Sequence, residues 1–345
     1  MVSQGNPVAK SRRDFIKYGG AASLVGLAGC SSLSGDNEEE EDFPSEPIEI
    51  IAAVDEGSQT DVELRAMADP LSNHTGVSVS VRNVPGGATM TGVGEVALAE
   101  PDGYMLTEGF STTTPITNLL TDVGWDARED LAPLLGWGGY TLGLFANPKY
   151  EVQGFQDAID RYADGEFNVI GGRGHGHPLH ILPTILKQSY GMEWNEIVTF
   201  DSVAPIVDGI IADDFPMGIG IGHWPGPPYD DIDFVGSFGD GPNPTVVLEE
   251  GQEIEHWGQE YDESLSWIAR AQNILFTTGG TPTERQDYLS EALESVITGE
   301  EFQSFAEESD TYAEVHSGRD GATELINTIL DELPNNMDVE EYRRN

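Results

Sequence analysis

The sequence predicts an α/β protein built around mostly parallel sheets. Short runs of apolar, β-branched residues alternate with longer helical patterns between residues 48 and 107. Glycine-bearing turns separate these runs, and a β-α-β order requires parallel strands with helices on the faces of the sheet. The length of 345 residues suggests about two domains of roughly 150 residues each.

The expected elements follow one another closely in the first third of the chain. The ranges are 48–53 (strand), 55–61 (turn), 62–73 (helix), 77–81 (strand), 85–88 (turn), 90–99 (helix) and 104–107 (strand). Ligands of open α/β sheets bind at the carboxyl ends of the strands, where these turns lie. Later in the chain we expect a strand and loop over 209–222, a strand over 267–277, helices over 282–298 and 321–333, and a frayed terminus over 338–345.

One stretch, residues 168–182, is the most informative. Val169 and Ile170 are typical of a strand end, and Pro178 is typical of the first position of a helix. Between them lie the glycines of the turn: Gly171, Gly172, Gly174 and Gly176. A helix that begins after such a turn directs free N–H groups and a positive dipole end toward it, which favours an anion bound by backbone groups.

Charge and cysteine content exclude several classes of protein. Asp and Glu number 61 against 16 Lys and Arg, a net charge of −45 spread along the chain. Such a surface indicates a protein kept soluble in very high salt, and no basic patch for nucleic acid is present. Cys30 is the only cysteine, so no intramolecular disulfide can form.

The first 30 residues have the pattern of an export signal. The pair Arg12-Arg13 precedes an apolar run that ends at Leu27-Ala28-Gly29-Cys30, the form of a lipobox. We expect export by the twin-arginine route, cleavage before Cys30, and lipidation of Cys30 with a diacyl anchor. Residues 31–46, rich in Glu, are expected to form an acidic tether.

Several further motifs occur in an order typical of one family. They are Gly57-Ser58-Gln59-Thr60-Asp61, Asn83-Val84-Pro85-Gly86-Gly87, Pro101-Asp102-Gly103-Tyr104-Met105-Leu106, Asp126-Ala127-Arg128-Glu129-Asp130-Leu131-Ala132-Pro133, Ala204-Pro205-Ile206-Val207-Asp208-Gly209-Ile210-Ile211 and Gly280-Thr281-Pro282, with the 168–182 stretch among them. Over about residues 47–331 the chain resembles the substrate-binding proteins of tripartite tricarboxylate transporters, the TctC or Bug family. Several positions depart from the family pattern. Asp55, Glu56, Ser58 and Gln59 replace much of the usual Pro-Ala-Gly-Gly-Gly loop, Val84 replaces the usual Arg, and Arg82 replaces the usual Glu. In the second loop, His175, His177 and Pro178 replace small hydroxyl residues.

The resemblance implies a type II periplasmic-binding-protein fold, with two lobes of mostly parallel sheets joined by crossing strands. The expected lobes are residues 47–138 with 269–345, and residues 139–268. We also expect a monomeric receptor with no cofactor and no catalysis, and the lipobox at Cys30 predicts that it is lipid-anchored to the outer face of the cell membrane. Such a receptor binds a small carboxylated solute in the cleft and delivers it to integral-membrane transporter subunits.

Candidate ligand contacts come from three loops. They are Ser58, Gln59, Thr60, Asp61, Ser111, Thr112, Gly172, Arg173, Gly174, His175, His177 and His180. Arg173 suits bidentate recognition of a carboxylate, although it could pair with a surface acid instead. Asp61 could bind a ligand or cap its helix. Aromatic residues that could line the cleft are Phe110, Trp224 and Tyr229.

The three histidines of the turn leave an alternative open. His175, His177 and His180 could bind Zn²⁺ or Ni²⁺, which would suit a secreted metal-dependent hydrolase. Protonated His175 or His177 could instead help hold an anion below about pH 6.5. The sequence contains no Gly-x-Ser-x-Gly and no His-Glu-x-x-His motif, which favours the receptor. A surface protein that kept this fold and lost transport is a third possibility.

Overall fold

The computed structural model describes residues 43–222, 229–242, 246, 248, 253–261, 265–309 and 311–343. The chain divides into residues 1–41 and one compact unit, residues 42–345. The predicted signal, Cys30, most of the tether, and the loop with Trp224 lie outside the described residues. The described part contains no helix long and apolar enough to cross a membrane.

Three parallel strands and three helices form the first half of the compact unit. They are β1 (Ile48–Ala52), α1 (Gln59–Thr75), β2 (Val79–Asn83), α2 (Met90–Ala97), β3 (Met105–Phe110) and α3 (Thr113–Leu120). β1 pairs with both β2 and β3 in parallel, which confirms the predicted β-α-β-α-β order. Ile48, Ile50 and Ile51 are fully buried in β1, as a strand covered on both faces requires.

A similar set forms the second half. It comprises α4 (Gly154–Ala163), β5 (Val169–Arg173), α5 (Pro178–Tyr190), β6 (Glu196–Phe200), α6 (Ala204–Ile211) and β7 (Met217–Ile221). β5 pairs in parallel with β6 and β7. The prediction of a strand and loop over 209–222 is wrong for its first residues, because α6 continues to Ile211 and the strand β7 begins only at Met217. Ile206, Val207 and Ile210 are buried at helical spacing on the inner face of α6.

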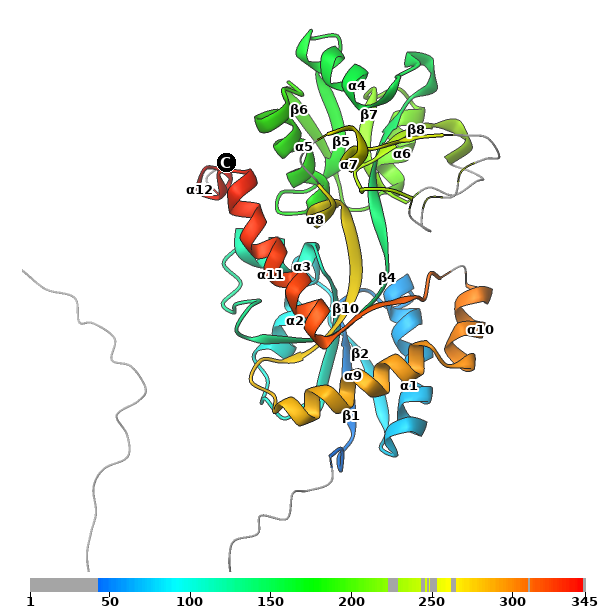
Figure 1. Ribbon diagram of the computed structural model, residues 1–345, viewed down its shortest axis with the longest axis vertical. Coiled ribbons are helices and arrows are strands. Elements are labelled where there is room, and N and C mark those ends of the chain that lie inside the picture. The colour runs from blue at the N-terminus through cyan, green and yellow to red at the C-terminus, as the bar shows by residue number, and fades with distance from the viewer. Residues whose placement is uncertain are drawn as a thin grey trace, which may run out of the picture. The chain divides into compact units, whose positions relative to one another are not determined.

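Two long antiparallel strands, β4 (Leu131–Ala146) and β10 (Arg270–Thr278), run between the halves (Figure 1). β4 pairs with β10 and β11 (Val315–Gly318) up to Thr141, and with β7 and β8 (Asp233–Ser237) from Leu142 onward. The strand order is β2-β1-β3-β10-β4-β7-β5-β6. β4 was not expected from the sequence, and the segment expected to be a strand from Trp267 begins with one helical turn, α8, before β10.

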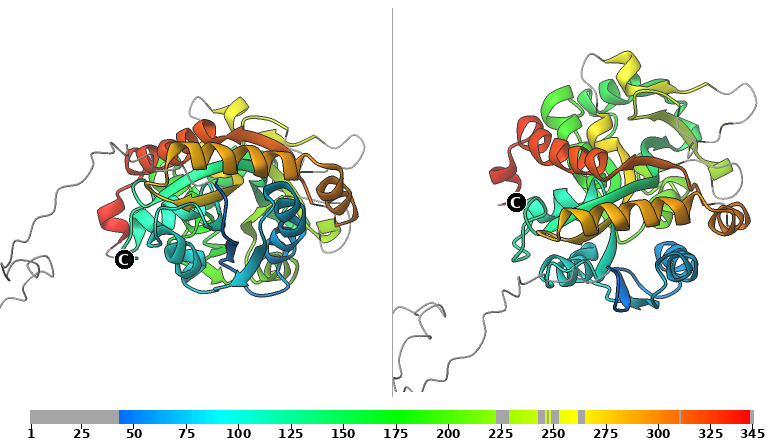
Figure 2. Two further views of the ribbon diagram at one scale, coloured as in Figure 1. Left: turned by 90° about the horizontal axis from the view of Figure 1, so that it is seen from below. Right: turned by 60° about the horizontal axis from the view of Figure 1, so that its bottom comes forward.

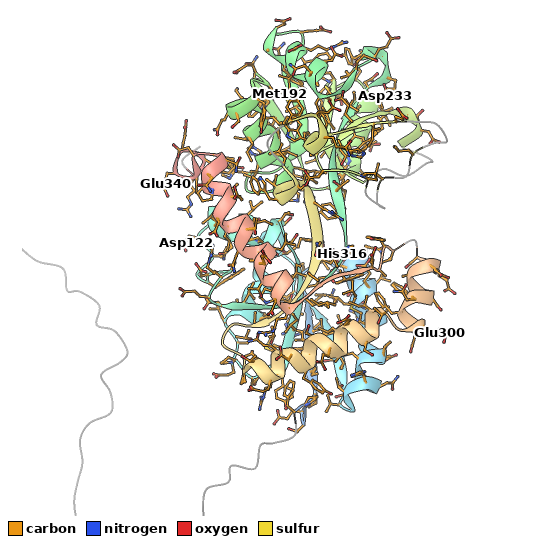
Figure 3. All side chains as sticks on the ribbon, in the orientation of Figure 1. Asp122, Met192, Asp233, Glu300, His316 and Glu340 are labelled. Atoms are coloured by element: carbon orange, nitrogen blue, oxygen red, sulfur yellow. The ribbon has the colours of Figure 1, made fainter. Side chains whose placement is uncertain are left out.

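Within β4, the backbone changes direction at two glycines. Gly138 and Gly139 have φ values of 51° and 97°, which side chains strongly disfavour. A Cβ on Gly139 would lie 2.1 Å from the carbonyl oxygen of Ala271, so only glycine fits there. His316, labelled in Figure 3, has its Nε2 2.8 Å from the carbonyl oxygen of Gly138.

The remaining elements include the long helices at the end of the chain. They are η1 (Gly87–Thr89), η2 (Pro148–Tyr150), η3 (Tyr229–Asp231), β9 (Glu255–His256), α7 (Trp257–Glu260), α8 (Ser266–Ala269), α9 (Thr283–Ile297), α10 (Glu300–Glu308), α11 (Arg319–Asn336) and α12 (Val339–Tyr342). α9 and α11 (Figure 2) confirm the helices predicted over 282–298 and 321–333. The expectation of a frayed terminus is wrong, because α12 forms and buries the ring of Tyr342.

Two larger hydrophobic clusters support the halves. One packs β1, α1 and α9 around Leu64, Trp137 and Phe302. The other surrounds β5 and α5, and it also includes Ile116 of α3 and Ile329 of α11. Helices α3 and α11 therefore contact the core of the second half. Exposed acids such as Asp122, Glu300 and Glu340 lie on the outside (Figure 3).

Candidate anion-binding site

The turn between β1 and α1 is organised by the buried carboxylate of Asp61. This side chain accepts hydrogen bonds from the backbone N–H of Gly57 (2.8 Å), Nε of Arg65 (3.0 Å) and Nδ2 of Asn83 (2.8 Å). Burial raises the pKa of Asp61, but the bonds from Arg65, Gly57 and Asn83 outweigh it and hold the pKa below its usual value. Protein donors thus occupy both carboxylate oxygens of Asp61.

The neighbouring candidates on this turn also have structural partners. Ser58 is the N-cap of α1, and its hydroxyl accepts from the N–H of Asp61. The Nε2 of Gln59 donates to Glu63 (2.8 Å) and to Thr311 (2.6 Å). Thr60 is half-buried. The β1–α1 turn is therefore held by internal hydrogen bonds.

Hydroxyl groups without partners gather where β3 leads into α3. Ser111 is fully buried, and its Oγ accepts from the N–H of Gln272 at 2.9 Å. Thr112 and Thr113 are 1% and 4% exposed, and the hydroxyl of neither has a hydrogen-bond partner within the described residues. Burying an unpaired hydroxyl costs about 1–3 kcal/mol, so these groups favour a ligand that can bond to them.

The turn between β5 and α5 has the predicted form of strand, glycine-rich turn and helix. His177 is the N-cap of α5, and its Nδ1 accepts from the N–H of Leu179 at 3.1 Å. Gly176 has a φ of 85°, in the left-handed region that favours glycine. Gly174 is exposed, and a Cβ there would meet nothing within 4 Å, whereas one on Gly172 would lie 2.6 Å from the carbonyl oxygen of Leu179.

Arg173, at the end of β5, is a half-buried cation without a counter-ion. Its guanidinium forms no ion pair or hydrogen bond within the described part of the chain. Burial lowers its pKa, while Tyr140 and Asp201 raise it electrostatically. An arginine keeps its charge under these conditions. By contrast, seven other described basic side chains pair with carboxylates: Arg65, Arg82, Arg128, Lys149, Arg161, Arg319 and Arg343.

Tyr140 connects Arg173 to the hydroxyls of α3. Burial raises the pKa of Tyr140, and the nearby Thr113, the charge of Arg173 and the nearby Thr112 partly offset this rise. The Tyr140 ring packs at 5.9 Å from that of Phe110. Arg173, Tyr140, Thr112 and Thr113 thus form one group, here called the Arg173 cluster. The predicted site did not include Tyr140, because the strand that carries it, β4, was not expected. It also did not include Thr113, although Thr113 follows directly after Thr112.

The histidines of the turn bond to the protein itself. Tyr342 of α12 lies against them: its carbonyl oxygen is 3.0 Å from Nε2 of His175, and its hydroxyl is 2.7 Å from Nδ1 of His180. The rings of Tyr342 and His175 stack with centroids 4.0 Å apart. The described residues contain no group of three or more His, Cys, Asp or Glu able to hold a metal ion.

Burial keeps two of these histidines neutral. It lowers the pKa of His177 to about 3, with help from Arg173 and His180, and lowers the pKa of His180 to about 4, with help from His175. The idea that a protonated His177 holds an anion just below pH 6.5 is therefore wrong. With no metal group in the described residues and with their rings engaged, the hydrolase alternative is not supported.

A pocket of about 440 Å³ brings loops of both halves together. It is lined by Gly87, Ala88, Met90, Thr91, Thr117, Thr121, Val123 and His175. The hydroxyl of Thr117 donates to the carbonyl oxygen of Gly176 at 3.2 Å, which joins α3 to the β5–α5 turn. Thr113 and Thr117 of α3 and Thr121, the residue after its end, follow at a spacing of four, so this side of α3 leads from the Arg173 cluster to the pocket.

Comparisons with known proteins agree with this architecture. The family model described as "Tripartite tricarboxylate transporter family receptor" (TctC) matches residues 64–199. A UPF0065 protein in the gbd 5′ region of Cupriavidus necator is 27% identical over 190 residues, 54% of this chain and 57% of that protein. Protein BugT of Bordetella pertussis is 28% identical over 184 residues, 50% of this chain and 55% of BugT. The matched part spans about half the length of these relatives.

Solved structures match over most of the chain. A TctC solute-binding protein from Polaromonas superposes with a TM-score of 0.69 at 18% identity, covering 86% of this chain and 100% of that one. MatC from Rhodopseudomonas palustris, with bound malate, gives a TM-score of 0.64 at 14% identity, with 85% and 99% covered. Rpa4515 of R. palustris, with adipate, gives 0.62 at 17% identity, with 88% and 98% covered.

These superpositions show the fold: the chain has the two-lobed α/β fold of periplasmic binding proteins, as predicted. Within that class, the family model and the curated relatives support the predicted resemblance to the TctC receptors.

Proposed function

We propose that this chain is an extracytoplasmic receptor that binds a small carboxylated solute and delivers it to a tripartite tricarboxylate-type membrane transporter. The observation that carries the proposal is the Arg173 cluster, where a half-buried guanidinium without an ion pair and the buried hydroxyls of Thr112 and Thr113 all act on Tyr140. An anion would satisfy all three groups together. The family match and the carboxylates bound by MatC and Rpa4515 support the same ligand class.

The expected affinity follows from the chemistry of these donors. A hydrogen bond to a charged group is worth about 1.5–3 kcal/mol, and an arginine can hold a carboxylate through two parallel bonds. Arg173 with the hydroxyls of Thr112 and Thr113 therefore accounts for a micromolar dissociation constant, which corresponds to about −8 kcal/mol. Of the remaining candidates, Gly172, Gly174 and Ser111 shape the loops, and His175 lies at the pocket.

The two lobes would close over this ligand. We place them at residues 47–138 with 269–345, and at residues 139–268. The change of β4 partners after Thr141 and the left-handed Gly138 and Gly139 support a hinge at this boundary. We expect the receptor to act as a monomer and without catalysis or cofactor.

The N-terminal pattern completes the proposal. Export through Arg12-Arg13, lipidation of Cys30 and the acidic tether over 31–46 would hold the receptor at the outer face of the membrane. The net charge of −45 fits a protein that works in concentrated salt.

A thermal-shift screen of the full chain in concentrated KCl tests the ligand class. Mono-, di- and tricarboxylates, amino acids and neutral sugars form the panel. A carboxylate at a hundred times its dissociation constant should stabilise the fold by about 2.7 kcal/mol. The same acid should stabilise Arg173→Gln far less and Arg270→Gln, a change at an exposed arginine, to the full extent. Stabilisation by sugars alone, or by no compound, would contradict the proposal.

A further inference from the structure

We propose that the pocket between the two halves binds hydroxyl groups of the solute, so that the receptor prefers a hydroxylated carboxylic acid to the same acid without hydroxyls. The pocket has a volume of about 440 Å³, and ligand pockets commonly fall between roughly 300 and 1,000 Å³. This inference rests on the proposed function and adds to it what the uncharged part of the solute carries. It follows from the polar atoms that line the pocket.

The lining of this pocket offers hydrogen bonds rather than ion pairs. None of the eight residues that line it is Asp, Glu, Lys or Arg. Three other pockets of the described residues each include carboxylates, with Glu294, Asp338 and Asp287 among them. In a chain of net charge −45, a pocket without acids is therefore a distinct environment, suited to a polar group without charge.

Two threonines of the pocket have already donated their only hydroxyl hydrogen. The hydroxyl of Thr117 donates to the carbonyl oxygen of Gly176 at 3.2 Å. The hydroxyl of Thr121 donates to the carbonyl oxygen of Thr117 at 2.5 Å. Because a carbonyl oxygen can only accept, the hydroxyl is the donor in both bonds, and its oxygen keeps lone pairs for another donor. Both threonines therefore present acceptors.

His175 presents a further acceptor, because Tyr342 of α12 determines which ring nitrogen carries the hydrogen. Nε2 of His175 lies 3.0 Å from the carbonyl oxygen of Tyr342, which can only accept, so Nε2 is protonated. Nδ1 of the neutral ring is then an acceptor, and within the described residues it has no hydrogen-bond partner. The Tyr342 ring stacks on the imidazole with centroids 4.0 Å apart, which holds its orientation.

Backbone donors complete the lining. Among the described residues, the N–H groups of Gly87 and Ala88 have no hydrogen-bond partner. A hydroxyl group can accept from such an N–H and donate to a threonine oxygen or to Nδ1 of His175. A methylene group would displace water from these atoms and bond to none of them, and an ammonium group could not accept from the N–H groups. The lining therefore matches hydroxyl groups best.

One small solute can reach both this pocket and the hydroxyls at the start of α3. The hydroxyl of Thr113 is buried and has no partner within the described residues. Thr113 is one helical turn before Thr117, about 6 Å along the axis at 1.5 Å per residue, on the same side of the helix. A carboxylate bound beside Thr113 would therefore place the neighbouring hydroxyls of a small acid at the pocket.

Pairs of acids that differ in their hydroxyl groups test the inference. Isothermal titration calorimetry of the full chain in concentrated KCl would compare lactate with propionate, 3-hydroxybutyrate with butyrate, malate with succinate, and gluconate with hexanoate. We expect the hydroxylated acid of at least one pair to bind, and to bind at least about tenfold more tightly than its partner, because the partner leaves the polar lining without hydrogen bonds.

Two variants assign this preference to the pocket. His175→Phe keeps a ring against Tyr342 and removes both nitrogens, and Thr121→Val removes an acceptor oxygen. Each should lower the ratio of the two affinities at least about threefold and leave the affinity for the acid without hydroxyls unchanged. The matched controls are His74→Phe, at an exposed residue of α1, and Thr328→Val, whose hydroxyl likewise donates to the carbonyl four residues earlier. A loss of folded structure would weaken both acids alike, so it would not change the ratio.

The outcomes distinguish this inference from the proposed function. If the acid without hydroxyls binds at least as tightly in every pair that shows binding, the inference fails while the proposed function stands. The inference also fails if both variants keep the full ratio, because the hydroxyls would then be bound elsewhere. If no acid of either kind binds the unmodified chain, the proposed function fails and the inference with it.

Discussion

The hydroxyl of Tyr342 accepts a hydrogen bond from the backbone N–H of Gly176, at 2.9 Å, across 166 positions of sequence. The same hydroxyl lies 2.7 Å from Nδ1 of His180. Arg343, the next residue, donates to the carbonyl oxygen of Leu119 at the end of α3. The C-terminal helix α12 therefore fixes the β5–α5 turn and contacts α3 at the same time.

Removing this hydroxyl should destabilise the fold. In Tyr342→Phe, the buried N–H of Gly176 loses its partner, and we expect a loss of about 1–3 kcal/mol in the free energy of unfolding. Urea denaturation in concentrated KCl measures it. Tyr150→Phe removes an exposed hydrogen bond to Asp213 and serves as the control, with a change below about 0.5 kcal/mol. Equal effects of the two substitutions would show that the α12 contact contributes little.

Two glycines of the turn should respond differently to alanine. A Cβ on Gly172 would lie 2.6 Å from the carbonyl oxygen of Leu179, so Gly172→Ala should cost about 1–3 kcal/mol through displaced backbone. Gly174 has open space, and Gly174→Ala should change stability by less than about 0.5 kcal/mol. Thermal unfolding of both variants compares them. A larger loss for Gly174→Ala would contradict this description of the turn.

Replacing Asp61 should lower the free energy of unfolding more than replacing Asp55, an exposed aspartate of the same turn. Asp61→Ala leaves Arg65, Asn83 and the N–H of Gly57 without their shared acceptor. We expect a loss of about 1–3 kcal/mol, because these donors lose a charged acceptor while Arg65 can turn to solvent, and chemical denaturation measures it. Asp55→Ala is the control, because Asp55 is exposed. If Asp61→Ala left stability unchanged and abolished ligand binding, Asp61 would be a ligand contact.

Stability should fall as the solution is acidified from neutral pH. The pKa of His180 is lowered to about 4 and that of His177 to about 3, from 6.5, so the unfolded chain binds protons that the folded chain does not. Their contribution is present above about pH 6.5 and is lost progressively as pH falls toward 4. Each histidine adds at most about 1.4 kcal/mol per pH unit, and less for the partly exposed His180 because solvent screens it.

Denaturation at pH 7 and pH 5 measures this slope. His180→Gln should flatten it, whereas His74→Gln, a change at an exposed residue of α1, should leave it unaltered. A slope that is the same in all three proteins would assign the acid sensitivity to other groups.

Replacing both residues of the Arg12-Arg13 pair by lysine should leave the uncleaved precursor in the cytoplasm, because the twin-arginine route reads the guanidinium pair. Fractionation and immunoblotting of the expressing cells report the outcome. Cys30→Ser provides the comparison: it should still be exported but should no longer partition with membranes. Normal export of the double-lysine chain would refute the proposed route.

Local patterns predicted the strand-turn-helix units well. The conformation of the β5–α5 turn follows from local residues: Val169 and Ile170 favour a strand, and Pro178 favours the start of a helix. The isoleucines of β1 likewise indicate a buried strand without reference to its partners. Ser58 and His177 are N-caps of the helices whose starts were predicted near them.

Contacts between distant segments could not be predicted in the same way. β4 contains four glycines and a proline, which argue against a strand locally, yet β10, β11, β7 and β8 all pair with it. The acidic terminus at residue 338 gave no sign that Tyr342 would bury itself on a turn far along the chain. The absence of an ion pair at Arg173 in the described residues could not be predicted either, because it depends on which carboxylates the fold brings close to this side chain.

The position of β10 has a consequence for the order in which the molecule assembles. This strand, residues 270–278, lies between β3 and β4, so the sheet that begins with β1 lacks its middle until most of the polypeptide has been synthesised. Amino-terminal fragments that end before it should expose the edges of β3 and β4 and remain prone to aggregation. The central sheet of this protein can therefore close only late, after residues 270–278 have been synthesised.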